Sequence, residues 1–423
     1  MTPAPAGLTC RLCGRADLRS VLDLGAAPPC QRFMTADQLD EPEPGLPLHL
    51  RLCADCLLLQ IPPLLSPADN FTDYAYYSSF SSSWVAHARR FVERAARELL
   101  PADAFVVEVA ANDGYLLQHV AARGIRCLGI EPSENCSDAA RRRGVPVHTA
   151  FLDKATAERV RAEHGPADLV IANNVWAHVP DVVGFTRALA TLVAEHGRIS
   201  IEVHHALSLV RDAQFDTIYH EHFQYWTVLA AERALAVAGL RLVDVELLPT
   251  HGGSIRLWAV PAASDVPVSG AVARVRQLER TAGLDTPAGY QGLAPAVGQI
   301  RDGLLRLLLD ARAAGQRVVG YGAAGKGQTL LNYAGVRPDL LAWIADKNPY
   351  KHGRYAPGTR IPVVDVDRIE QERPDLILVL PWNLREEITG QLSGVGRWGG
   401  RLVFAQPRLT VIDPGAAAIE GAA

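Results

Sequence analysis

The chain is short of cysteine, of long apolar runs and of clustered positive charge, and each shortage argues against a class of protein. Seven cysteines among 423 residues are too few for a disulfide scaffold. No run of about 18 apolar residues is present that would span a bilayer. The formal net charge is −4 and no basic block occurs, so a nucleic-acid partner is disfavoured. The first residues are too polar for a secretory signal, and we expect a cytoplasmic protein without a membrane partner.

The remaining composition is that of an ordinary globular chain. Hydrophobic residues make up 48% and charged residues 21%, which is a typical balance for packed domains. The length of 423 residues is enough for two or three domains, each with its own core.

Four cysteines form two close pairs, Cys10 with Cys13 and Cys53 with Cys56. Each pair can present two thiolates on one tight turn, and two such turns complete a tetrahedral sulfur site. The Pro-rich segment 26–47 between them has too little apolar content to hold a fold unaided, so a metal would stabilise it. Four protein ligands leave no open position, and we therefore predict a structural zinc. Free or redox-active thiols are the alternative.

From residue 104 the chain alternates strands and helices, which predicts a mostly parallel, doubly wound sheet. Ligands of such sheets bind beyond the carboxyl ends of the strands. The expected strands are 104–109, 126–131, 145–150, 168–173 and 198–203.

The first of these strands ends in a loop that lacks the G-x-G-x-x-G pattern a dinucleotide needs. Its acidic and amide side chains around a glycine suit a cationic ligand with an ammonium group, such as S-adenosylmethionine, which has no phosphate. An acid at the end of the second strand, about 20 residues on, is expected to bind the ribose hydroxyls. An ordinary turn with a helix cap is the alternative. The predicted cofactor contacts are Glu108, Asn112, Asp113, Gly114, Glu131 and Asn173.

A dense polar motif, Tyr219, His220, Glu221 and His222, lies between an expected strand and an Ala- and Leu-rich helix. Titratable groups packed this closely between apolar elements indicate a cleft in which protons move. His178 follows the fourth strand and is expected at the same rim of the sheet. A solvated linker with chance histidines is the alternative. The Ser- and Tyr-rich loop 71–84 is equally consistent with a ligand-lining segment and with a surface loop.

The C-terminal part contains a second nucleotide-like pattern. An expected strand, 317–321, leads into a glycine-rich loop, 320–327, and Asp346 follows about 20 residues on. Taken alone, this pattern predicts an NAD site. The stretch 266–314 is expected to form two connecting helices with breaks at Pro287 and Pro295.

Together these segments resemble the family of S-adenosylmethionine-dependent sugar C-methyltransferases that act on nucleotide-linked deoxysugars. The resemblance covers nearly the whole chain. One departure is Ala110, where the family commonly has glycine. The matching segments are both cysteine pairs, 74–79, 108–114, 130–133, 174–178, 219–222, 320–327, 346–351, 357–359 and 380–384.

The resemblance implies an α/β protein of three parts. These are an N-terminal zinc-binding module (1–72), a central class I Rossmann-like methyltransferase domain (73–248) that binds S-adenosylmethionine, and a C-terminal second Rossmann-like domain (249–423) that binds the nucleotide-sugar substrate. In this reading the C-terminal glycine loop serves no redox chemistry. Lys326, Asn348 and Lys351 are expected to bind the substrate, the lysines near its diphosphate. A monomer is expected.

The resemblance also implies a mechanism. The substrate would be a 4-keto hexose on dTDP, whose ketone acidifies the adjacent C3–H. His222 is expected to remove that proton, and the enolate then takes the methyl group. Glu221 is expected to orient His222 or to contact the substrate. Tyr219 and His178 are expected to hydrogen-bond the enolate oxygen or to act on its proton. Tyr76 is expected to close the site, with Tyr77 as the other candidate.

Three alternatives to this function stay open at this point. The first is another ketone-bearing acceptor for the methyl group. The second is an NAD(P)-dependent sugar reductase or epimerase that uses the C-terminal glycine loop. The third is a zinc-ribbon interaction or RNA-binding protein, against which the acidic balance counts.

Overall fold

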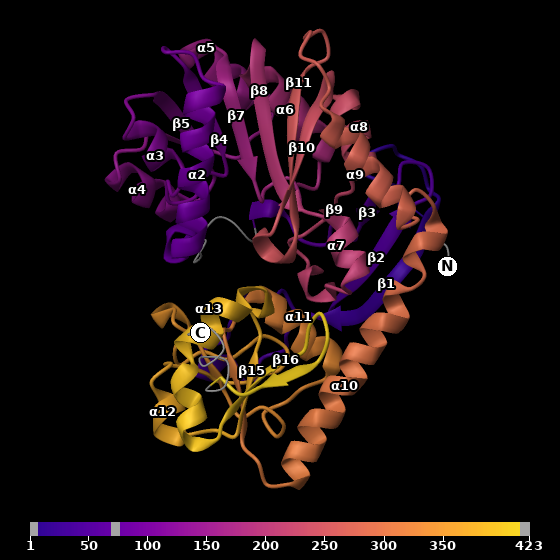
Figure 1. The fold of residues 1–423 in the computed structure, drawn as a ribbon, viewed down its shortest axis with the longest axis vertical. Coiled ribbons are helices and arrows are strands. Elements are labelled where there is room, and N and C mark those ends of the chain that lie inside the picture. The colour runs from indigo at the N-terminus through magenta and orange to yellow at the C-terminus, as the bar shows by residue number, and fades with distance from the viewer. Residues whose placement is uncertain (1–6, 69–76, 415–423) are drawn as a thin grey trace, which may run out of the picture.

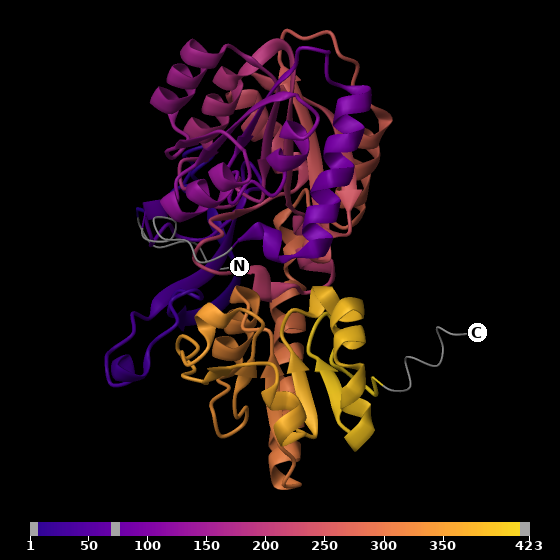
Figure 2. The same cartoon turned by 90° about the vertical axis from the view of Figure 1, so that its left-hand side faces the viewer.

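The computed structural model describes residues 7–68 and 77–414, which form three sheets with helices around two of them (Figure 1). The expected α/β class, with two Rossmann-like sheets and an N-terminal cysteine module, is confirmed. Figures 1 and 2 show the N-terminal strands, in indigo, beside the junction of the two larger domains. No helix of the described ranges is long and apolar enough to cross a membrane.

The N-terminal sheet has four strands in the order β1-β2-β3-β9, and its last strand comes from a distant part of the chain. Leu59 and Gln60 of β3 pair antiparallel with Tyr225 and Gln224 of β9. The polar motif at 219–222 therefore runs directly into the sheet of the cysteine module. The strands are β1 (Leu18–Ala27), β2 (Leu46–Cys53), β3 (Leu59–Gln60) and β9 (Gln224–Tyr225).

The central sheet has seven strands in the order β10-β11-β8-β7-β4-β5-β6. One of its inner strands, β4, is buried at all five positions, as a strand covered by helices on both faces must be. The five strands from β8 to β6 are parallel, and the β10–β11 hairpin is antiparallel. The strands are β4 (Phe105–Val109), β5 (Arg126–Glu131), β6 (Val147–Thr149), β7 (Ala167–Asn173), β8 (Val193–His204), β10 (Leu240–Leu248) and β11 (Ser254–Pro261).

Helices before and between these strands cover the central sheet. Several begin at a side-chain cap, for example Asp153, whose carboxylate accepts a hydrogen bond from the Thr156 amide. The expected domain boundary at residue 248 falls between β10 and β11, which pair with each other. The helices are α2 (Ser82–Glu98), α3 (Leu117–Ala121), α4 (Glu134–Arg142), α5 (Lys154–His164), α6 (Val182–Leu192), α7 (Ala206–Arg211) and α8 (Val228–Val237).

Two helices connect the central and C-terminal domains, as expected for 266–314, and they are α9 (Gly270–Thr281) and α10 (Leu293–Ala313). The expected break at Pro295 is wrong, because this proline is the third residue of α10. A proline fits there because the first amides of a helix have no intrahelical partner to lose.

The C-terminal sheet has six strands in the order β14-β13-β12-β15-β16-β17, and only β17 is antiparallel to its neighbour. The strands are β12 (Val318–Tyr321), β13 (Ile344–Ala345), β14 (Val363–Val364), β15 (Leu376–Val379), β16 (Arg401–Phe404) and β17 (Thr410–Ile412). The helices are α11 (Gly325–Ala334), α12 (Arg368–Glu372) and α13 (Arg385–Gln391).

Short 3-10 helices fill several of the connections between these elements. They are Ala36–Gln38, Ser78–Phe80, Phe215–Thr217, Thr250–Gly252, Pro287–Tyr290, Pro349–Lys351, Trp382–Leu384 and Ser393–Trp398.

The N-terminal module takes part in two hydrophobic cores. Leu18, Cys10, Cys53 and Cys56 pack with the central sheet, in a core that also contains Trp226. Leu22 and Leu50 belong to a second core with Leu304 of α10. The module therefore contributes apolar side chains to the cores of both larger domains.

Candidate active site

One cavity of about 2060 Å³ lies between the three parts of the protein. The carboxyl ends of β4, β5, β7 and β8 open into it, and so do the glycine loop after β12 and the segment Pro29–Phe33 of the N-terminal module. Of the predicted site residues, it is lined by Asn112, Glu131, Asn173, His178, Tyr219, Glu221, His222, Lys326, Asn348 and Lys351. Tyr77 also lines it, whereas Tyr76 lies outside the described residues.

The loop after β4 is held in a strained conformation against the end of β5. Ala110 and Asn112 have φ of 56° and 48°, in the left-handed region that side chains other than glycine rarely adopt. Glu131 stabilises this conformation, because its carboxylate accepts hydrogen bonds of 2.9 Å from the amides of Asn112 and Ser133. This acid at the second strand end therefore shapes the loop as well as facing the cavity.

Glu108 and Asp113 do not line the cavity, although both were expected to bind the cofactor directly. Burial, with Glu131 and Asp113 nearby, raises the pKa of Glu108 well above its usual range. The Asp113 carboxylate is fully buried and pairs with Arg143 at 2.6 Å. Gly114 has a φ of 77°, and a Cβ there would lie 3.2 Å from that of Ala140. These three residues build the loop from beneath.

His222 is held in one tautomer by two hydrogen bonds. Its Nδ1 lies 2.9 Å from the carbonyl oxygen of Thr217, which can only accept a hydrogen bond, so Nδ1 carries the proton. Its Nε2 lies 2.8 Å from the hydroxyl of Tyr219. In the neutral ring Nε2 is therefore the acceptor, and its lone pair points at Tyr219. His178 lies beside this pair, with ring centroids 4.6 Å apart.

The segments that carry His178 and His222 are bonded to each other. The amide of Phe223 donates to the carbonyl of Ala177 at 2.8 Å. Trp176 and Trp226, both fully buried, stack with ring centroids 3.7 Å apart and planes 6° apart. This stack fixes the distance between the two histidine-bearing segments. His178 therefore lies beside the 219–222 motif at one rim of the sheet, as the sequence predicted.

Burial shifts the titration of this cluster away from its ordinary range. Burial, with His178 nearby, lowers the pKa of His222 well below its usual value, and burial lowers the pKa of His178 to about 4. Burial raises the pKa of Glu221 to about 7. Both imidazoles are therefore neutral near pH 7, as a general base must be, and Glu221 is close to half protonated.

In the C-terminal glycine loop, the acid of the dinucleotide pattern, Asp346, binds backbone amides of the loop and its surroundings. The Asp346 carboxylate accepts hydrogen bonds from the amides of Ala323, at 2.7 Å, and Asn348, at 2.8 Å. The ammonium of Lys351 lies 3.5 Å from Asp346 and donates to the carbonyl of Ala323 at 2.9 Å. In a dinucleotide site such an acid would face the ribose hydroxyl. Here it fastens the loop, and it also lines the cavity.

Lys326 connects the two larger domains. Its ammonium donates to the carbonyl of His251 at 3.1 Å and lies 5.5 Å from the ring centroid of Trp382. Burial lowers the pKa of Lys326, and Asp216 opposes that shift. The imidazole of His251 is in turn 3.2 Å from the side-chain nitrogen of Asn174, just beyond β7.

His251 and Asn174 line the cavity, and the sequence interpretation did not select either. The available sequence signal was a histidine directly before two glycines. In the structure His251 itself has a φ of 56°, in the left-handed region.

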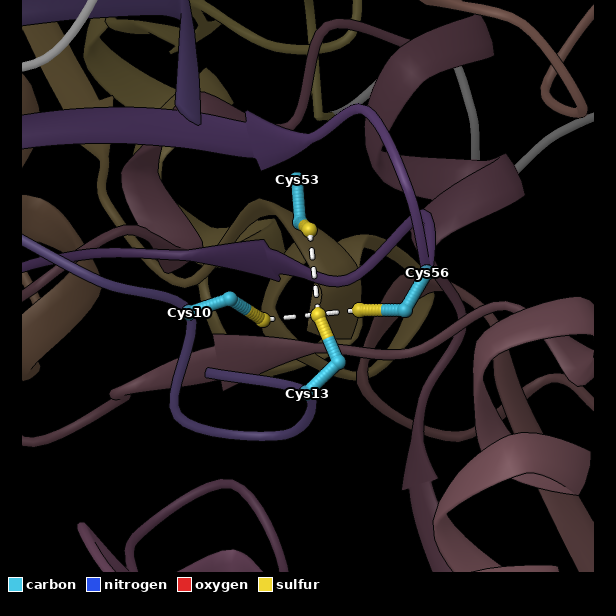
Figure 3. Close-up of side chains that lie close together, drawn as sticks. All are labelled: Cys10, Cys13, Cys53 and Cys56. Atoms are coloured by element: carbon cyan, nitrogen blue, oxygen red, sulfur yellow. Dashed lines mark hydrogen bonds between the residues drawn. The ribbon is translucent and has the colours of Figure 1, made fainter. Parts of the chain in front are cut away.

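The four predicted metal ligands come together at one point (Figure 3). Their sulfur atoms all lie within 4.8 Å of one another, with Cys10 and Cys56 3.4 Å apart and Cys13 and Cys53 3.5 Å apart. A tetrahedral zinc with bonds of about 2.3 Å holds its sulfurs about 3.8 Å apart, so the cluster fits zinc.

The two cysteine turns have the same backbone pattern. The amides of Cys10 and Cys53 donate to the carbonyls of Arg15 and Leu58, each five residues on. Each turn also has a left-handed residue after its second cysteine, Gly14 with φ 74° and Leu57 with φ 63°. Two equivalent turns that face each other present four thiols without further rearrangement.

Comparison with known proteins defines the class to which this fold and site belong. Residues 249–407 match a family model described as "C-methyltransferase C-terminal domain", residues 84–245 match "Methyltransferase domain", and residues 10–71 match "Putative zinc binding domain". The chain is a S-adenosylmethionine-dependent C-methyltransferase with an N-terminal zinc-binding domain.

Its curated relative, C-methyltransferase NovU of Streptomyces niveus, is 31% identical over 405 residues, which are 96% of each chain. The chain therefore belongs to the C-methyltransferase family of NovU, as the sequence resemblance predicted. Its enzyme class is that of a methyltransferase, and the NAD(P)-dependent reductase or epimerase alternative is set aside. Its cofactors are S-adenosylmethionine and a structural zinc.

Solved structures match the chain over less than half of its length. Magnesium protoporphyrin IX methyltransferase from Synechocystis shares 18% identity over 42% of this chain and 82% of its own, with a TM-score of 0.34. The CcbJ methyltransferase from Streptomyces caelestis shares 14% identity over 42% of this chain and 90% of its own, also with a TM-score of 0.34.

The cysteine cluster predicts that zinc content and thermal stability depend on its four thiols. We expect one zinc per chain in the wild type and loss of that zinc in the double variant Cys10→Ser, Cys53→Ser, with a lowered thermal midpoint, because structural zinc supplies folding free energy. Elemental analysis and thermal unfolding measure both. The buried Cys127, which lies outside the cluster, is the matched control, and Cys127→Ser should retain zinc. A stable wild type without zinc would contradict the site.

The raised pKa of Glu221 predicts a pH-dependent stability. Its folded pKa, about 7, lies above the unfolded value of 4.5, so its contribution is present below about pH 4.5 and is lost as pH rises through about 7. Relative to Glu221→Gln, the wild type should lose about 3 kcal/mol between about pH 5 and pH 8. Urea unfolding of both proteins measures the difference. Glu195→Gln, at an exposed position, is the control, and its free energy of unfolding should depend on pH as that of the wild type does. The same dependence in Glu221→Gln would mean that the Glu221 carboxyl is solvated, which would contradict the prediction.

Proposed function

We propose that this C-methyltransferase acts on a dTDP-4-keto-deoxysugar and methylates C3, the carbon next to the ketone. The observation that supports this most is the Tyr219–His222 pair, which faces the same cavity as the loop after β4 and the C-terminal glycine loop. A neutral imidazole whose Nε2 is unprotonated is suited to remove a proton acidified by a ketone once the Tyr219 hydroxyl releases that nitrogen. A carbon acid of this kind needs such a base before it can accept a methyl group.

The methyl donor is proposed to occupy the half of the cavity formed by the central sheet. Asn112, Glu131 and Asn173 line that half and offer amide and carboxylate groups to an amino acid, a sulfonium and a ribose. Glu131 still faces the cavity while its oxygens accept two amide bonds, and this leaves lone pairs for ribose hydroxyls. Glu108, Asp113 and Gly114 are assigned the indirect role of shaping the loop.

In the proposed reaction the C3 proton passes to Nε2 of His222, and the C3–H electron pair forms the enolate. C3 then forms a bond to the methyl carbon as the bond from sulfur to methyl breaks, which releases S-adenosylhomocysteine and one proton. The Tyr219 hydroxyl, which bonds Nε2 in this structure, transfers its hydrogen bond to the enolate oxygen. His178 is proposed as the second donor to that oxygen.

Glu221 is proposed to contact the sugar. Its carboxyl faces the cavity beside the histidine pair, and its raised pKa of about 7 lets it either donate to or accept from a substrate hydroxyl. Tyr76, or Tyr77 in its place, is proposed to close the site from the Ser-rich loop. Tyr77 already accepts a hydrogen bond of 3.3 Å from the Asn135 side chain at the cavity wall.

The dTDP group is proposed to lie against the C-terminal domain, near Lys326, Asn348 and Lys351. These side chains line the cavity next to the start of α11, where free amides and the helix dipole favour a phosphate.

The proposed domains are 1–72, 73–248 and 249–423. Strand β11 belongs to the last domain in sequence but pairs with the central sheet in space. A monomer suits a site built from one chain.

The substrate class is tested with a labelled methyl donor and a panel of dTDP-4-keto sugars. We expect a product that is heavier by one methylene, with the label at C3, detected by mass spectrometry and NMR. Sugars with a 4-hydroxyl in place of the ketone are the matched controls and should give none, because their C3–H is not acidified. Methylation of those controls, or only of ketones without a nucleotide, would contradict the proposal and favour the alternative acceptor.

The role of His222 is tested by exchange as well as turnover. With S-adenosylhomocysteine bound, the wild type should exchange the C3 hydrogen of the substrate for solvent deuterium. His222→Ala should lose that exchange and about 10²- to 10⁴-fold in kcat, the usual contribution of a general base. Tyr219→Phe should retain exchange at a reduced rate. Near-normal turnover of His222→Ala with intact cofactor binding would exclude His222 as the base.

A further inference from the structure

The zinc module does more than stabilise itself, because one of its residues bonds a strand that directly follows the Tyr219–His222 pair. Arg11 lies between the two ligands of the first cysteine turn. Its guanidinium Nη1 donates to the side-chain oxygen of Gln224 at 3.0 Å, across 213 residues of sequence. A zinc-binding turn is thereby connected to the strand that follows the Tyr219–His222 pair.

Gln224 extends this connection to the other histidine. Its amide nitrogen donates to the carbonyl of Val179 at 3.1 Å and also to that of Trp176. These two carbonyls flank His178 in the sequence. One fully buried carboxamide therefore holds the turn that presents His178, while its own backbone lies two residues from His222.

Arg11 is fixed in place by contacts of its own. Its amide donates to the side chain of Gln60 at 3.2 Å, its Nη2 donates to the carbonyl of Ile61, and its guanidinium lies 5.4 Å from the ring centroid of Phe223. Gln60 pairs directly with Gln224 across β3 and β9.

We propose that Arg11 and Gln224 are positioning residues that use the zinc-bound turn to hold His178 and His222 at their separation in the active site. This inference rests on the proposed function for the roles of the two histidines. The physical reason is the orientation of a glutamine side chain. With its oxygen bound to Arg11, the nitrogen must point at the two carbonyls, and without Arg11 the amide can rotate and release them. An error of about 1 Å in such a position costs about 10²-fold in rate.

Four variants and one control separate this role from a general loss of stability. Gln224→Leu removes both sets of hydrogen bonds. Gln224→Glu keeps an acceptor for Arg11 but lacks the donor for the carbonyls of Trp176 and Val179, so the connection to Arg11 survives while the hold on His178 is lost. Arg11→Met removes the orienting cation, and Arg11→Lys retains a donor and should restore part of the activity. Arg15→Met, at an exposed position in the same cysteine turn, is the matched control.

We expect both Gln224 variants to lose about 10²-fold in kcat, whereas KM and the Kd for S-adenosylhomocysteine stay within about threefold. Zinc content should remain one per chain. Arg11→Met combined with Gln224→Leu should be no slower than Gln224→Leu alone, because Arg11 acts through Gln224. Multiplied losses, unchanged kcat in Gln224→Glu or loss of zinc in Arg11→Met would each overturn the inference.

A measurement that needs no substrate keeps the inference apart from the proposed function. Hydrogen–deuterium exchange of segments 173–181 and 219–226 should accelerate in Arg11→Met and Gln224→Glu, and remain at the wild-type rate in Arg15→Met. If the wild type methylates none of the sugars, the proposed function fails while this result still decides the inference. If the wild type is active and exchange in both segments is unchanged, the inference fails alone.

Discussion

The active site depends on the hydrogen bonds that join the segment after β7 to the segment before β9. The amide of Phe223 bonds the carbonyl of Ala177, and the stacked rings of Trp176 and Trp226 lie directly beneath. Burial keeps the imidazoles neutral, and because Nδ1 of His222 lies against the carbonyl oxygen of Thr217, which can only accept a hydrogen bond, His222 has a single tautomer. The same burial that stabilises the contact therefore also sets the protonation state that base chemistry requires.

The three parts of the chain are arranged around that contact. Parallel strands open their carboxyl ends toward one cavity from the central domain, and the glycine loop after β12 faces it from the C-terminal domain. The cysteine module closes the arrangement at the side, where β3 pairs with β9. Two ligands that bind separate domains can meet only if the domains keep a fixed relation, and the shared hydrophobic cores supply it.

Much of the fold was predictable because its signals are local. The strand over 126–131 has the expected bounds, and both cysteine pairs form turns that bring four sulfurs within 4.8 Å. The errors have local causes as well. Pro295 begins α10 rather than breaking it, since first-turn amides lack partners. Glu108 and Asp113, which were expected to bind the cofactor, are fully buried and do not line the cavity, and a spacing pattern does not reveal such burial.

Sequence alone was sufficient for the alternation of strands and helices in the Rossmann-like parts, the chemistry of the metal ligands and the choice of His178, Tyr219 and His222 as a group. Those features follow from residue types and short spacings. The tautomer of His222, the internal use of Asp346 and the reach of Arg11 to Gln224 needed the folded chain. Each depends on the direction of a hydrogen bond or on the depth to which a side chain is buried. Both are set by groups that folding brings together from distant segments, and no local sequence pattern encodes that geometry.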